Sequence, residues 1–219
     1  MTLKYNTHDK DLVELAGFHA YLGYDKFDLI NINDSWYEVK NIKADTVTGL
    51  NAITIKNLDN NNNEHIVVFV GTDVKQLEDV KTDIFLLSDT NVPQLEAAKL
   101  YYEEMDKKYG VDSVTGNSLG GALANRVGVE FPHVRTVTYN PALLPKHQVE
   151  ADKDYDNITN YFGEYDILSG SLISLGLDDT IFRVQSMKHH IMAYHLDQVR
   201  SIPKGYNCFF ISCRNSANS

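Results

Sequence analysis

The chain has 219 residues, of which 43% are hydrophobic, and its formal net charge is −10. This length and composition fit one globular α/β domain with a substantial core over residues 1–219, with residues 1–50 as a candidate N-terminal extension or cap. The acidic balance argues against nucleic acid as a partner, because affinity for nucleic acid depends on basic contacts. It also disfavours electrostatic docking on anionic membranes, although a local apolar patch could still touch lipid at the periphery.

Targeting and redox signals are sparse. The first ten residues are polar and lack the apolar core of a signal peptide, and no apolar run reaches the length of a membrane span. We therefore expect a protein that is cytoplasmic, exported by a leaderless route, or separated from its leader. Cys208 and Cys213 are expected to be free thiols rather than a pair. No spacing of His and Cys fits a metal site, so we expect no metal and no cofactor.

The first half of the chain predicts two helices and two strands. Apolar residues at helical spacing predict a helix over 11–22, and a second one over 94–109 lies between Pro93 and Gly110. Alternation over 52–56 and an apolar run over 65–70 predict two strands. The Asn-rich tract 59–63 between them predicts a hairpin loop that joins an outer strand to a buried one.

The second half alternates strands and helices. We expect strands over 111–115, 134–139 and 157–162, and helices over 119–130 and 196–202. Alternation of this kind is typical of a mostly parallel sheet covered by helices on both faces.

The run Gly116-Asn117-Ser118-Leu119-Gly120 reads as a G-x-S-x-G nucleophile elbow. It follows a predicted strand and opens a predicted helix, which is the context the motif requires. Such a turn presents its serine on an exposed strand-to-helix corner, so Ser118 is the candidate nucleophile. The alternative is a glycine-rich turn in which Ser118 is an ordinary helix cap.

A serine nucleophile needs a base, a group that orients the base, and donors for the oxyanion. Asp166 is the candidate acid because it follows the predicted strand 157–162 and a glycine turn. Glu164 competes with it, and a turn-capping aspartate is the structural alternative. His189 and His190 are the candidate bases, and adjacent side chains on a strand point in opposite directions. The amide of Leu119 and the amide and hydroxyl of Thr72, at the end of the strand 65–70, are the candidate oxyanion donors.

Taken together, these segments resemble the class 3 lipases of the α/β-hydrolase fold. The similarity lies in Val67–Asp73, in Thr115–Ala124 with its elbow, and in the segments around Asn140-Pro141 and Tyr165-Asp166. A bacterial and phage branch, which includes lipase effectors exported by type VII secretion, shares a late His-x-Ile/Met-x-x-Tyr pattern. His189 fits that pattern with Tyr194, so the resemblance implies His189 as the base, with His190 as the alternative.

The resemblance also implies a serine hydrolase that cleaves acyl esters of lipids, as a triacylglycerol lipase or phospholipase does. An immunity or export partner protein follows from the family analogy alone. The apolar runs 84–87 and 167–177 favour an acyl chain as the substrate group, and the second is typical of a mobile lid or membrane-touching loop. The alternatives are a soluble esterase or thioesterase for small substrates, and a catalytically silent binding module.

Overall fold

The computed structural model describes residues 7–59, 63–71, 92–142, 144–145, 148–150, 153–163 and 188–192; of residues 92, 162–163 and 188–192 it describes the backbone alone. The helices are α1 (Asp9–Gly17), the 3-10 helix η1 (His19–Tyr21), α4 (Val92–Tyr109) and α5 (Leu119–Glu130). The strands are β1 (Leu29–Ile32), β2 (Ser35–Ala44), β3 (Asn51–Asn57), β4 (His65–Phe69), β5 (Ser113–Asn117), β6 (Arg135–Tyr139), β7 (Ile158–Gly163) and β8 (Lys188–Met192).

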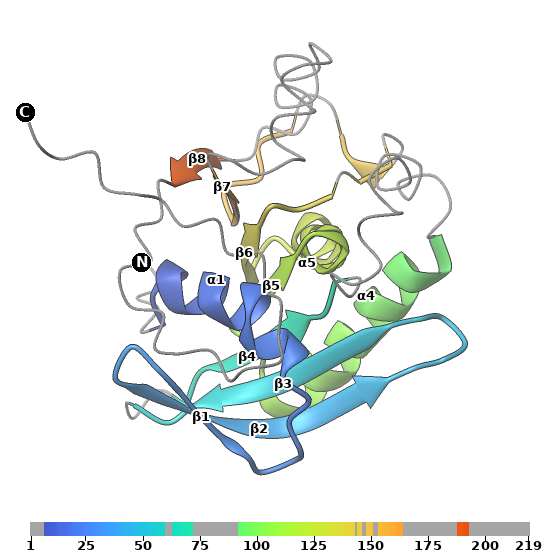
Figure 1. Ribbon diagram of the computed structural model, residues 1–219. Helices are drawn as coiled ribbons and strands as arrows, with labels where there is room; N and C mark the ends of the chain where they lie inside the picture. Colours follow the sequence, from blue (N-terminus) through green and yellow to red (C-terminus); the bar gives the residue numbers. More distant parts are fainter. Residues whose placement is uncertain are drawn as a thin grey trace, which may run out of the picture.

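The eight strands form one sheet in chain order, from β1 to β8. Strands β1 to β4 pair antiparallel, whereas β4 to β8 pair parallel, so four of the seven described pairings are parallel. Figure 1 shows the β1–β3 ribbon at one end of the sheet and β8 at the other. The predicted α/β class, with a mostly parallel central sheet and flanking helices, is confirmed.

The two faces of the sheet carry different helices. On one face, α1 buries Leu12 and Leu15 against Val68 and Val137. On the other face, α4 and α5 bury Tyr102 and Leu123 in a second cluster of core residues. Helices therefore cover both faces, as expected for parallel strands that are apolar on both sides (Figure 1).

The segment 1–50 contributes more than its sequence pattern predicts. Its described part supplies α1 and the strands β1 and β2, and β2 pairs with β3. The interpretation of β3 as an outer strand is therefore wrong, because β2 covers its free edge. The division into a single domain with an N-terminal extension or cap stays a prediction.

The first predicted helix is interrupted. It was expected to run over residues 11–22, but α1 ends at Gly17 and is followed by η1. The cause is local, because the backbone of Phe18 leaves the helical region with φ −131° and ψ −62°.

Polar contacts fix α1 to the sheet. The Arg135 guanidinium on β6 forms an ion pair with Asp9 and donates to the Thr7 carbonyl at 2.8 Å, and the Tyr161 hydroxyl on β7 also donates to Asp9. One turn further along the helix, Thr115 Oγ1 on β5 donates to the Leu12 carbonyl at 3.0 Å. These contacts join α1 to the strand that leads into the elbow.

Candidate active site

The elbow is built as the sequence predicts. Ser118 lies between the last residue of β5 and the first residue of α5, with φ 54° and ψ −120°. This backbone conformation is strained for a residue with a side chain, and such strain is typical of a nucleophile elbow. Ser118 makes no side-chain hydrogen bond to the helix start, which removes the helix-cap interpretation.

Backbone hydrogen bonds hold the strained residue. The Ser118 amide donates to the Tyr139 carbonyl at 3.1 Å, and its carbonyl accepts from Ala122 at 3.2 Å and from Ala142 at 2.9 Å. The bonds to Tyr139 and Ala142 tie the elbow to the end of β6 and to the turn that follows it. The surrounding sheet thus stabilises a conformation that the chain would not adopt alone.

The elbow requires glycines because neighbouring atoms lie too close to leave room for a Cβ atom. A Cβ atom at Gly116 would lie 2.1 Å from the Gly120 carbonyl oxygen, and a Cβ at Gly121 would lie 2.7 Å from Pro141 Cβ. Distances under 3.0 Å are essentially never seen for real Cβ atoms. The small residues therefore permit the turn from β5 into α5 to close against itself and against the β6 end.

The serine is less accessible than the motif suggests. Ser118 is 6% exposed and Leu119 is 9% exposed, so both residues are buried. The expectation of an exposed corner is wrong for this conformation of the chain.

The end of β4 meets the elbow directly. A Cβ at Gly120 would lie 2.3 Å from the Phe69 carbonyl oxygen and 2.9 Å from the Gly71 nitrogen. Thr72 follows Gly71 and lies outside the described residues. Leu119 begins α5, so its amide belongs to the first turn, whose N–H groups have no acceptor within the helix. The described residues thus bring the elbow, Leu119 and the residue before Thr72 together.

The acid and the base remain predictions. Strand β7 ends at Gly163, and Asp166 and its competitor Glu164 lie outside the described residues. His189 and His190 lie on β8, with backbone registers opposite Asn160 and Tyr161 of β7, and their side chains are outside the described part. Strands β6 and β7 lie between β5 and β8, so three inter-strand spacings, about 14 Å, separate β8 from β5.

An N-terminal contact with the elbow was missed by the sequence analysis. Tyr21, at the end of η1, lies with its hydroxyl 3.4 Å from Asn117 Nδ2. Nearby, His19 is 8% exposed and its Nδ1 lies 2.6 Å from the Tyr24 hydroxyl. Burial, with a smaller contribution from Asp28, raises the pKa of Tyr24 to about 12. No local pattern signals these contacts, because Tyr21 and Asn117 are 96 positions apart in the chain.

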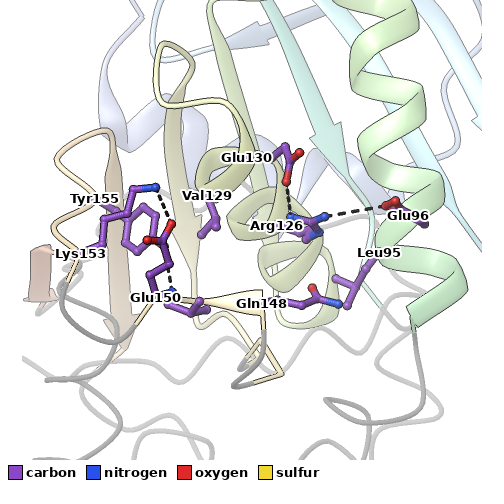
Figure 2. Close-up of a pocket in the computed structure, with 10 residues that line it drawn as sticks. Leu95, Glu96, Arg126, Val129, Glu130, Gln148, Glu150, Lys153 and Tyr155 are labelled. Atoms are coloured by element: carbon purple, nitrogen blue, oxygen red, sulfur yellow. Dashed lines mark hydrogen bonds and ion pairs between the residues drawn. The ribbon is translucent and has the colours of Figure 1, made fainter.

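A separate pocket of about 610 Å³ opens beside α4 and α5 (Figure 2). Its lining residues are Leu95, Glu96, Arg126, Val129, Glu130, Gln148, Val149, Glu150, Lys153 and Tyr155. The Arg126 guanidinium lies 2.9 Å from Glu130 and 3.9 Å from Glu96, as the dashed lines in Figure 2 show. Of the described elbow residues, neither Ser118 nor Leu119 belongs to this lining, so the pocket is distinct from the elbow.

No protein-family model matches the chain, and no curated protein matches it in sequence. Among solved structures, the chain is similar to the Lip2 lipase from Yarrowia lipolytica, with 14% identity and a TM-score of 0.48. That match covers 73% of this chain and 66% of the lipase, which is just under two thirds of its length. A predicted CIB-like hydrolase from Thermoplasma acidophilum is similar with 14% identity and a TM-score of 0.45, over 72% of this chain and 87% of that one. Both similarities are distant and say nothing about the chemistry of this chain.

The chain's own topology shows an α/β architecture in which a strand–elbow–helix unit carries Ser118. In the described residues, no helix is both long and apolar enough to cross a membrane.

Proposed function

We propose that the chain is a serine hydrolase that cleaves carboxylic esters of lipids, with Ser118 as the nucleophile. The observation that carries the proposal is the backbone of Ser118, with φ 54° and ψ −120°, at the junction of a parallel strand and a helix. A non-glycine residue is held in such a conformation only where the surrounding structure stabilises it, and these positions cluster at active sites. The glycine contacts and the backbone bonds described above supply that stabilisation.

The reaction follows from the predicted roles. The Ser118 hydroxyl attacks the ester carbonyl while the imidazole of His189, or His190 as the alternative, takes its proton. Asp166 orients that ring, and the amides of Leu119 and Thr72 donate to the oxyanion. The protonated ring then gives its proton to the departing alcohol, which leaves an acyl ester on Ser118. Water, activated by the same base, releases the acid and restores the serine.

A lipid ester is the proposed substrate because apolar runs follow both the predicted oxyanion turn and the predicted acid. These runs, 84–87 and 167–177, lie outside the described residues, so they support the proposal from sequence alone. A soluble esterase or thioesterase is the competing activity.

Covalent labelling tests the nucleophile. The purified protein is treated with a fluorophosphonate probe, and we expect one modified site that is lost in Ser118→Ala. Ser113→Ala is the matched control, because Ser113 lies on the same strand, is 1% exposed and precedes the elbow. Loss of labelling in Ser118→Ala alone supports the proposal. Absence of labelling in the unmodified protein would favour the silent binding module and end the proposal.

A chain-length series tests the substrate class. Hydrolysis of p-nitrophenyl esters from acetate to palmitate is measured with and without an emulsified phase. We expect the rate to rise with acyl length and with aggregated substrate, and to vanish in Ser118→Ala. A preference for acetate or butyrate in free solution would identify a small-substrate esterase instead.

A further inference from the structure

The contact between Tyr21 and the elbow involves two strand ends. A Cβ atom placed on Gly71, at the end of β4, would lie 2.8 Å from the Tyr21 hydroxyl oxygen and 2.5 Å from the Asn117 carbonyl oxygen. The same hydroxyl lies 3.4 Å from Asn117 Nδ2, at the end of β5. The phenol oxygen therefore lies where β4 and β5 both end, beside the residue that precedes Ser118.

Backbone hydrogen bonds and core packing hold η1, the short helix that carries Tyr21. The Tyr21 amide donates to the Phe18 carbonyl at 3.1 Å, and the Leu22 amide donates to the His19 carbonyl at 3.2 Å. His19 of the same turn is buried, and α1, which precedes it, packs on β5 and β6. The phenol thus reaches the elbow from an element whose own position is set by the core.

Gly71, which follows β4, depends on its neighbours to hold its position. Gly71 has no side chain with which to hold its place, and its neighbours in the elbow are the backbone atoms of Asn117 and Gly120. In the proposed reaction, the amide that follows Gly71 must aim at the oxyanion, and a displacement of about 1 Å can cost about 100-fold in rate. The Tyr21 oxygen lies on the side of Gly71 where a Cβ atom would be, so it limits displacement of Gly71 in that direction.

We infer that Tyr21 is a positioning residue that holds Gly71, the residue before the predicted oxyanion donor, against Asn117 of the nucleophile elbow. This inference rests on the proposed function and deepens it, because it assigns to the N-terminal segment a part in the same site. Tyr21 acts through Gly71 and Asn117 rather than on the substrate. We therefore expect Tyr21 to affect kcat rather than KM, because the direction of the oxyanion-binding amide matters most in the transition state.

Kinetics of Tyr21→Phe test the inference, since this change removes the oxygen and keeps the ring. We expect kcat for the best ester substrate to fall about 10-fold, with KM within about 2-fold of the unmodified protein. Tyr24→Phe is the matched control, because it loses a shorter contact, 2.6 Å to His19, in the same segment. It is expected to leave kcat within about 2-fold. An unchanged kcat in Tyr21→Phe, or an equal loss in both variants, would overturn the inference.

Amide hydrogen exchange gives a readout that does not require hydrolysis. In Tyr21→Phe we expect faster exchange at the amides of Gly71 and Asn117, with no change at Val127 in the middle of α5. Unchanged exchange at both strand ends would overturn the inference even for a protein without esterase activity. Failure of the proposed function has a different readout: the fluorophosphonate probe would then not label the unmodified protein.

Discussion

Gly120→Ala is the most direct test of how the elbow is packed. The added Cβ would lie 2.3 Å from the Phe69 carbonyl oxygen, and reaching even 3.0 Å requires a shift of at least about 0.7 Å. The opposing atoms belong to the backbone of β4, which cannot rotate away as a side chain can. Overpacking of this kind costs about 1–3 kcal/mol, and about 1 kcal/mol is regained because alanine favours helix over glycine. We therefore expect a net loss of about 0–2 kcal/mol in the free energy of unfolding.

The larger effect is expected on reactivity. A shift approaching 1 Å between β4 and α5 separates Gly71 from Ser118, so we expect the rate of fluorophosphonate labelling to fall about 10- to 100-fold. Gly128→Ala is the matched control, since it makes the same change in the same helix. Gly128 lies near the C-terminal end of α5, away from the elbow, and its Cβ would lie 2.4 Å from a side-chain atom, Thr136 Oγ1 on β6.

Urea unfolding and labelling kinetics are measured on both variants. Gly128→Ala is expected to lose stability and to keep its labelling rate in the folded protein. The reasoning is refuted if Gly120→Ala is labelled as fast as the unmodified protein, or if the labelling rate falls by the same factor in both variants.

Two further predictions concern stability. Leu12→Ala removes a fully buried side chain of α1, so we expect the free energy of unfolding in urea titrations to fall by about 2–5 kcal/mol. Leu29→Ala is the control at a 58% exposed position, and we expect it to change the free energy of unfolding by less than about 0.5 kcal/mol. Equal effects of the two variants would mean that α1 contributes nothing to the core. Burial, followed by the nearby Lys56 charge, lowers the pKa of His65, so the unfolded chain binds the proton more readily and stability is lost as the pH falls below about 6.5. His65→Phe keeps the ring that stacks on Tyr109 and should remove this part of the pH dependence, and identical pH profiles of unfolding for both proteins would contradict the assignment.

Local sequence was sufficient for the elbow and the helix after it. The helix predicted over 119–130 coincides with α5, because small residues, helical spacing and Pro132 act within a few residues of one another. The hairpin between β3 and β4 was predicted for the same reason, from an Asn-rich tract between two strand patterns. Ser118 could be singled out because the glycines that the turn requires are its neighbours in the chain.

The sequence by itself determined the α/β class, the strand–elbow–helix unit and the candidate nucleophile, since each depends on patterns shorter than about 20 residues. Only the tertiary structure decided that β2 covers β3, that Ser118 is 6% exposed and that Tyr21 reaches the strand ends beside the elbow. The physical reason is the range of the contacts. Sheet order, burial and the Tyr21–Asn117 contact join segments tens of residues apart, and no local periodicity encodes which of them meet.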